Sequence, residues 1–553
     1  MAEDTTLNDT TLREQAPRPE GIPPVLDEAH IGDIRGALGT IKLHDTGARH
    51  GVRARLAALL AIMGPGLIVM VGDNDAGGVS TYSQAGQNYG TTLLWTLVLL
   101  IPVLIVNQEM VIRLGAVTGV GHARLINERF GRFWGWFSVG DLFILNFLTI
   151  VTEFIGVSLA LEYFGVSRYI AVPGAALTLI AITSTGSFRS WERFMYVFVV
   201  ANFLVIPLLL FAHPQLGQIA HHTFIPGIQG GASSTAVLLI IAIVGTTVAP
   251  WQLFFQQSNI IDKRITPRWI NYERADTVIG AFVVVLGAGA LIAVTAFAFG
   301  GTPYAGHFND AGTVATGIGR RLGSTAGAFF AIVLLNASLI GAAAVTLSTS
   351  YAFGDVFGAR HSLNRGLRDA KMFYASFALM VVFAAAIVLI PGAPLGLITT
   401  SVQALAGVLL PSATVFLLLL CNDREVLGPW ANPPWLNAIA SVIIAVLVEL
   451  SLILMASTMF PHIDVTRLFE YLSLGTVAGL IVAGVYTLRR RAPRTEMSPE
   501  ESIPERSTWT MPPLALLERP VWSPGRKAGM LLLRGYLVVA MVLLVVKTVQ
   551  LAH

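Results

Sequence analysis

The stretch LIVMVGDNDAGGVSTY, residues 67–82, decides the fold. It begins as an apolar run typical of a membrane helix and then places Asp73, Asn74 and Asp75 ahead of two glycines. A peptide group without a hydrogen-bond partner is costly in hydrocarbon, so a break of this kind must line a cavity enclosed by protein or filled with water. The stretch therefore predicts an interrupted membrane helix with a polar site near its middle.

A second interpretation makes 67–82 a loop between two shorter spans. The apolar run from Leu56 to Gly72 is itself nearly long enough to cross a bilayer. However, the sequence VSTYSQAGQNYG, which starts at Val79, continues as a half-helix that leads into a short turn. This continuation favours the interrupted helix.

The composition indicates a polytopic helical membrane protein. Of the 553 residues 54% are hydrophobic and only 12% are charged, whereas a soluble domain carries about a quarter charged residues. The apolar residues form runs of about 20, the length that crosses a bilayer as a helix. A single cysteine, Cys421, excludes an intrachain disulfide. We find no P-loop, nucleophile elbow or HExxH motif, so we predict neither an enzyme nor a cofactor, and no nucleic-acid partner.

Twelve spans are predicted from the apolar runs. A further run near 528–549 contains Arg534 and is either a thirteenth span or an interfacial helix. The twelve lie near residues 57–88, interrupted at 73–78; 92–116; 133–162; 168–185; 194–212; 234–260, interrupted near 249–252; 275–300; 324–352; 372–391; 397–420; 434–458; and 465–488.

Basic residues predict the orientation in the cell membrane. Arg49, Arg53 and Arg55 precede the first span, and every second loop after it is rich in arginine or lysine, whereas the loops GQNYGTT and IPGAPLG have neither. Because basic loops stay in the cytoplasm, we expect a cytoplasmic N-terminus. The predicted organisation is a cytoplasmic N-terminal segment 1–54, a transmembrane domain 55–491, a cytoplasmic linker 492–527 and a C-terminal hydrophobic helix 528–553.

The sixth span is interrupted as well. Its sequence GTTVAPWQ contains Pro250, which cannot continue the helical hydrogen-bond ladder. A simple proline kink would explain this segment alone. However, an odd number of spans separates it from the first break, so the second half would be inverted relative to the first. Two interrupted helices at matching positions predict an inverted-repeat transporter with its site at the membrane midplane.

The first break is rich in hard oxygen ligands. Unwound carbonyls, Asp73, Asn74 and Asp75 offer the oxygen atoms that hard cations prefer. Gly78 permits unusual backbone dihedrals and the close approach of an ion. A site for a divalent cation is therefore the predicted use of the break.

The motifs around the break resemble the NRAMP family of divalent-metal transporters over about residues 55–490. The tripeptide GPG (64–66) is followed eight residues later by DAGG, where the family has DPGN. This resemblance implies an all-α polytopic membrane protein with a LeuT-like fold. That fold has two inverted five-helix repeats, and helices 1 and 6 are interrupted. The other stretches that resemble the family are RLGAVTG (113–119), INERFG (126–131), SVQALAGVLLPSA (401–413) and NDREVLG (422–428).

The resemblance also implies the site residues. Asp75 matches the family's metal-binding aspartate, Gly78 replaces its asparagine, and Gln403 matches a glutamine that faces the site. In the sixth span the family has MPHN, and this chain has Ala249, Pro250, Trp251 and Gln252. The predicted metal ligands are Asp75, Asp73, Asn74, Gly78 and Ala249, and the other predicted substrate contacts are Gln252, Gln403 and Trp251.

The departure at Ala249 changes the expected metal. The family's methionine sulfur attracts soft transition metals, whereas an oxygen-only shell suits Mg²⁺, Ca²⁺ or Mn²⁺. The shorter side chain also leaves room for an ion that keeps its waters, as Mg²⁺ does. The sequence resembles the NRAMP-related magnesium transporters in this respect, so we expect import of partly hydrated Mg²⁺ by alternating access.

Proton coupling is not expected to be obligatory. The family has an acid pair in its third span, of which Glu153 matches the glutamate while Ile150 stands at the aspartate position, and Gln256 replaces a histidine. Glu153 is then either a remnant of a proton pathway or a buried structural acid. Three alternatives stay open: a proton-coupled Mn²⁺ or Fe²⁺ symporter, a Na⁺-coupled organic-solute transporter of the same fold, and a membrane sensor that signals through 492–527. The oligomeric state is open, and a monomer would suffice.

Overall fold

The computed structural model describes residues 29–489, apart from 46, 393, 394 and 461. Beyond these it describes residues 503–518, 520, 529–536, 538, 539 and 542. The first part of the predicted N-terminal segment, much of the predicted linker and most of the run 528–549 therefore lie outside the described residues.

The described chain is helical, with one small hairpin. One to three helices lie at each of the twelve positions predicted as spans. The elements are β1 (Ile34–Arg35), β2 (Thr40–Ile41), α1 (Val52–Ile62), α2 (Pro65–Gly72), α3 (Ala76–Tyr89), α4 (Leu94–Thr118), α5 (His122–Phe130), α6 (Arg132–Glu162), α7 (Arg168–Thr183), α8 (Phe188–Asn202), α9 (Val205–Phe211), α10 (Leu216–Phe224), α11 (Ser234–Thr247), α12 (Trp251–Asp262), η1 (Pro267–Trp269), α13 (Ile270–Phe299), α14 (Ala311–Leu322), α15 (Ser324–Phe357), α16 (Lys371–Val388), α17 (Leu395–Cys421), α18 (Arg424–Leu427), η2 (Gly428–Trp430), α19 (Pro434–Met459), α20 (Val465–Arg489), α21 (Ile503–Thr508) and η3 (Leu514–Leu516).

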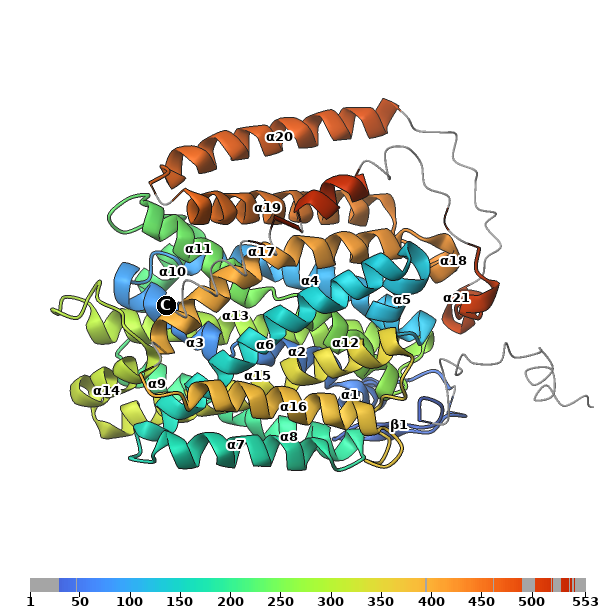
Figure 1. The fold of residues 1–553 in the computed structure, drawn as a ribbon, viewed down its shortest axis with the longest axis horizontal. Coiled ribbons are helices and arrows are strands. Elements are labelled where there is room, and N and C mark those ends of the chain that lie inside the picture. Colours follow the sequence, from blue (N-terminus) through green and yellow to red (C-terminus); the bar gives the residue numbers. More distant parts are fainter. Residues whose placement is uncertain are drawn as a thin grey trace, which may run out of the picture.

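The long helices form one bundle. Within the described residues nine helices are long and apolar enough to cross a membrane, and the bent pair α1 and α2 brings the number up to ten. The long helices run side by side in Figure 1, with α10 and α14 at one end of the bundle and the hairpin, α5 and α18 at the other. We name these two ends the α14 end and the α1 end.

The centre of the bundle is built from both halves of the chain. α6 packs along α15, while α13 packs on α2, α3 and α4. Gly156 of α6 makes the central contact possible, because a Cβ atom there would collide with the Ser338 side chain of α15 and the Ala76 side chain of α3. Small residues let membrane helices approach closely, since lipid gives them no other strong driving force to associate. The two interrupted segments are held at this centre.

The first span bends before it breaks, which the sequence analysis did not predict. α1 and α2 meet at 55°. The bend lies at Gly64, whose φ of 153° favours glycine, and Pro65 then opens α2. The Asp276 carboxylate of α13 accepts hydrogen bonds from the N–H groups of Gly64 (2.9 Å) and Gly66 (2.8 Å). These are N–H groups that the start of a helix leaves unsatisfied, so Asp276 stabilises the bend.

The N-terminal hairpin is also an element that the sequence analysis did not predict. β1 and β2 pair antiparallel, and Ile34 and Ile41 are buried. In the turn between them the Ala37 N–H donates to Glu192 Oε2 of α8 at 2.5 Å. The hairpin is thereby tied to the α1 end of the bundle.

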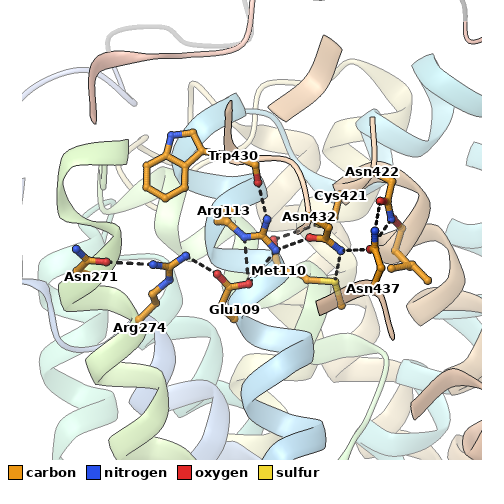
Figure 2. A network of polar contacts seen from close by, with 11 residues as sticks. Glu109, Met110, Arg113, Asn271, Arg274, Cys421, Asn422, Trp430, Asn432 and Asn437 are labelled. Atoms are coloured by element: carbon orange, nitrogen blue, oxygen red, sulfur yellow. Dashed lines mark hydrogen bonds and ion pairs between the residues drawn. The ribbon is translucent and has the colours of Figure 1, made fainter. Parts of the chain in front are cut away.

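A second polar network ties α4 to the helices that follow α17 (Figure 2). Glu109 and Arg113 form a local i,i+4 ion pair at 2.8 Å. Arg113 also donates to the Trp430 carbonyl (2.5 Å) and to Asn432 Oδ1 (2.6 Å), and Arg274 of α13 donates to Glu109 (2.5 Å). The network fixes α4 and α13 to the segment that leads into α19.

Candidate functional site

The first break is the tripeptide Asp73–Asp75. α2 ends at Gly72 and α3 begins at Ala76, so the break is shorter than the predicted 73–78. Asp75 is the N-cap of α3, and its Oδ1 accepts a hydrogen bond from the Gly78 N–H at 2.7 Å. This cap satisfies one of the N–H groups at the helix start and allows α3 to begin earlier than predicted.

Glu153 of α6 lies beside Asp75. Its Oε2 accepts a hydrogen bond from the Ala76 N–H at 3.1 Å. The two acids lie side by side against Gly341 of α15, where an added Cβ atom would be 2.7 Å from Glu153 Cδ and 2.9 Å from Asp75 Cβ. Both acids are buried, with exposed fractions of 0% and 3%. The N-terminus of α3 favours negative charge through its dipole and its free N–H groups. This position stabilises a pair of acids that would otherwise repel each other.

The second break is Val248–Pro250, close to the predicted 249–252. α11 ends at Thr247 and α12 begins at Trp251. The Ala249 carbonyl accepts one hydrogen bond, from the Gln252 N–H at 3.2 Å, which leaves it a second lone pair. The C-terminus of α11 therefore presents carbonyl oxygens at the break, as the C-terminus of α2 does at the first break.

Side chains join the two breaks. Gln252 of α12 donates through Nε2 to Asp73 Oδ1 and also to the Thr247 carbonyl at 3.2 Å. Tyr82 of α3 shares a hydrogen bond of 2.7 Å with Thr247 of α11. The structure thus brings Asp73, Asp75 and Gln252 together, although 177 residues separate Asp75 from Gln252 in the sequence.

Gln108 of α4 belongs to this site, and the sequence analysis missed it. Its Nε2 donates to Gln252 Oε1 at 2.9 Å. Gln108 and Gln252 are both almost fully buried. The signal in the sequence was the polar pair Asn107–Gln108 inside the apolar run of the second span. Gln108 orients Gln252, which in turn orients Asp73.

Two further predicted residues line the same region. The Gln403 amide of α17 lies directly against Gly77, where a Cβ atom would collide with it. Trp251 is 1% exposed, packs against Gly72, and accepts a hydrogen bond at its carbonyl from Ser348 of α15 (3.0 Å). Gln403 therefore lies against the first turn of α3, next to the first break, and Trp251 packs against the end of α2 on the other side of the break. Contact of either residue with a substrate stays a prediction.

Asn74 and Gly78, both predicted as metal ligands, already have hydrogen-bond partners within the protein. The Asn74 side chain donates to the Val284 carbonyl of α13 at 3.1 Å, so its amide nitrogen points away from the second break. Gly78 lies in the first turn of α3 and its N–H is occupied by Asp75. Ligation of a metal by either residue stays a prediction.

The site offers oxygen atoms that could coordinate a cation. Among the described residues, Asp73 Oδ2 and Gln108 Oε1 are buried and have no hydrogen-bond partner. No group of three acid, histidine or cysteine side chains within the described residues has the geometry to hold a metal by itself. A cation bound here would therefore need Asp73 and Asp75 together with backbone carbonyls, the mixed oxygen shell typical of hard cations.

Comparison with protein families identifies the architecture. Residues 66–457 match the Nramp family, described as natural resistance-associated macrophage protein-like. The chain belongs to the Nramp family. Its LeuT-like fold with interrupted helices 1 and 6 confirms the predicted fold class. Together with the apolar helices, membership makes it a multi-pass membrane protein.

Similar proteins and a solved structure are consistent with membership of this family. The chain is 26% identical over 414 residues to the divalent metal cation transporter MntH of Aeromonas hydrophila, covering 72% of this chain and 96% of the relative. It is 28% identical over 429 residues to MntH of Mesorhizobium japonicum, covering 73% and 90%. The Eremococcus coleocola manganese transporter superposes with a TM-score of 0.59 at 20% identity, over 82% of this chain and 97% of that one. The last comparison concerns the fold alone.

Proposed function

We propose that this Nramp protein carries a divalent metal ion across the membrane by alternating access, with Asp75 as its anchoring ligand. The observation that carries the proposal is the meeting of two helix breaks, with Asp75 capping one and Gln252 linking the other to Asp73. Opposed helix ends of this kind bind ions in transporters with inverted repeats. The names of the relatives, which are divalent metal cation and manganese transporters, support the same substrate class.

Mn²⁺ is the first candidate for the ion. The relatives favour it, and an all-oxygen shell accepts it. Mg²⁺, which the sequence analysis placed first, is the second candidate, since Ala249 brings no sulfur to the second break. Met70 of α2 does not bring sulfur to the site either, because its side chain packs against Gly280 of α13. A site without sulfur binds Mn²⁺ and Mg²⁺ with less discrimination than one with a thioether.

Uptake by purified protein in liposomes tests the proposal. Mn²⁺ uptake that is competed by Mg²⁺ and weakly by Cd²⁺ is expected for an oxygen-only site. Uptake of Mg²⁺ that resists an equal concentration of Mn²⁺ would reverse the order of the two candidates. Absence of uptake for every divalent ion, from protein that is monodisperse in detergent, would refute the proposal. Na⁺-dependent uptake of an organic solute would favour the alternative of the same fold.

Changing Ala249 to methionine is expected to shift the preference toward soft ions. A thioether at the second break favours Cd²⁺ over Mg²⁺, and we expect the ratio of their apparent affinities to rise about tenfold, or about 1.4 kcal/mol. Ala249→Leu is the matched control, because it adds similar bulk without sulfur. Competition of Cd²⁺ and, separately, of Mg²⁺ against Mn²⁺ uptake measures the shift. An equal shift in both variants would show that bulk, and not sulfur, sets the preference.

Gly341 of α15 is expected to tolerate no side chain. A Cβ atom there would lie 2.7 Å from Glu153 Cδ and 2.9 Å from Asp75 Cβ. Gly341→Ala should therefore force the two acids apart and lower Mn²⁺ uptake about tenfold or more, in line with an overpacking cost of about 1–3 kcal/mol. Gly140→Ala in α6, where a Cβ atom meets open space, is the control. Uptake by Gly341→Ala at the control's rate would contradict the placement of both acids.

Proton coupling is a separate question. The sequence analysis expected no obligatory coupling, because Ile150 stands at the position of an acid and Gln256 at that of a histidine. The structure places Glu153 against Asp75, so one titratable group does lie beside the site. A pH-sensitive dye inside the liposomes separates the two forms of the proposal. Acidification of the lumen in step with Mn²⁺ uptake supports proton-coupled transport, and a constant luminal pH supports uptake without protons.

The direction of uptake follows from the proposed orientation. We place the α1 end in the cytoplasm, because the loops at Arg264 and Arg365 lie there and basic loops stay inside. A divalent ion that moves inward across 100 mV gains about 4.6 kcal/mol. The membrane potential alone therefore favours import strongly.

A further inference from the structure

A stripe of polar side chains runs along α12 away from the two breaks. Gln252, Gln256, Asn259 and the adjoining Lys263 are each at most 1% exposed. They are spaced by four, three and four residues, which puts them on one face of the helix. The stripe begins at the Asp73 contact of Gln252 and ends at the α1 end of the bundle. Buried polar groups inside a membrane protein call for partners or for a function.

Glu273 of α13 lies across from the middle of this stripe. Gln256 Nε2 donates to Glu273 Oε1 at 3.3 Å and to Thr277 Oγ1 at 2.8 Å. Among the described residues, three oxygens here lack any hydrogen-bond partner: Glu273 Oε2, Gln256 Oε1 and Asn259 Oδ1. All three side chains are fully buried. Native proteins rarely leave such atoms unpaired unless a ligand or water occupies the place in another state.

The other charges nearby are already compensated. Lys263 pairs with Glu192 of α8 at 2.5 Å and donates to the Met63 carbonyl at 2.7 Å. Asp276 accepts hydrogen bonds from the N–H groups at the start of α2. Within the described part of the chain, Glu273 therefore forms no ion pair, and the hydrogen bond that it accepts from Gln256 is long, at 3.3 Å.

We propose that Glu273, Gln256 and Asn259 form a second station for the transported divalent ion, between the Asp75 site and the α1 end. One carboxylate and two amide oxygens, completed by waters, make a weak and hydrated shell of the kind that Mg²⁺ and Mn²⁺ accept. Such a shell draws the ion out of the tighter site without trapping it. The inference rests on the proposed function, since an ion must first reach Asp75.

Glu273→Gln in the full-length protein tests the station. In liposomes we expect the maximal rate of Mn²⁺ uptake to fall at least tenfold, while the KM for external Mn²⁺ changes by less than about twofold, because the Asp75 site is intact. Glu273→Asp should recover part of the rate. Glu128→Gln, which removes an exposed acid on α5, is the matched control and should transport as the unchanged protein does. Retained Mn²⁺ binding by purified Glu273→Gln shows that the variant is folded.

The outcomes separate the station from the proposed function. If the unchanged protein takes up no divalent ion, the proposed function fails. If it transports and Glu273→Gln matches its rate, the station is refuted. If Glu273→Gln keeps its Mn²⁺ uptake but loses acidification of the lumen, Glu273 carries a proton and the station is again refuted. A rate loss with an unchanged KM, partly reversed by Glu273→Asp, supports it.

Discussion

Replacing Asp75 with alanine is expected to reduce Mn²⁺ uptake at least about a hundredfold, equivalent to about 2.7 kcal/mol. Asp75 is 3% exposed, it caps α3, and it lies beside Glu153 at the positive end of that helix. Removal of its carboxylate takes away the anchoring charge for a divalent ion and one of the few ligands that a hydrated ion would use. Tracer uptake into liposomes measures the loss.

A second substitution separates ligation from capping. Asparagine caps helices about as well as aspartate, so Asp75→Asn keeps α3 in place while it removes the charge. We expect Asp75→Asn to lose uptake as fully as Asp75→Ala does, and Glu128→Ala, on the exposed face of α5, to lose none. Uptake by Asp75→Asn at half the original rate or more would show that Asp75 acts through the helix and not on the ion.

The positions of the spans could be predicted because the bilayer imposes them. Runs of about 20 apolar residues leave few alternatives, and each coincides with one to three helices. The existence of the breaks could be predicted for the same reason, since a carboxylate such as Asp73 is costly in lipid and Pro250 cannot continue the helical hydrogen-bond ladder. These inferences depend on local composition, which the sequence contains in full.

The exact bounds of the breaks depend on contacts between distant residues. α3 starts at Ala76 because Asp75 caps it and Glu153, 77 positions away from Ala76, accepts its first N–H group. The 55° bend before α2 depends on Asp276, which lies 212 residues after Gly64. Gln108 could not be assigned to the site from the sequence, because an amide side chain in an apolar run can have many roles. Its role becomes clear only from its hydrogen bond to Gln252. Sequence patterns within one helix cannot supply such pairs.

The choice between Mg²⁺ and Mn²⁺ could not be predicted from the sequence motifs. The missing methionine at Ala249 argued for Mg²⁺, whereas the names of the relatives favour Mn²⁺. Both ions accept oxygen shells, so the absence of sulfur removes an attraction to soft ions without choosing between two hard ones. The choice depends on the size of the shell and the number of waters that stay on the ion, and competition of Mg²⁺ against Mn²⁺ uptake examines it directly.

Replacing Lys263 with methionine is expected to destabilise the protein by about 3–5 kcal/mol. Lys263 Nζ lies 2.5 Å from Glu192 Oε1, and both side chains are 0% exposed. Methionine fills a similar volume but leaves the Glu192 carboxylate buried without its cation. The loss should fall on the α1 end, because Glu192 also accepts the Ala37 N–H of the hairpin and Lys263 donates to Met63 at the bend. Unfolding in mixed detergent micelles measures the free energy.

The double variant Lys263→Met with Glu192→Leu distinguishes a lost ion pair from lost packing. Because a hydrophobic pair of similar volume is often as stable as a buried ion pair, we expect the double variant to recover most of the stability. Arg467→Met is the exposed control: its pair with Asp464 is 3.3 Å long with side chains 76% and 55% exposed, so its removal should cost less than about 1 kcal/mol. A double variant no more stable than Lys263→Met would mean that Lys263 acts mainly through its hydrogen bond to the Met63 carbonyl. In that case the lysine stabilises the bend at Gly64 and does not act by neutralising Glu192.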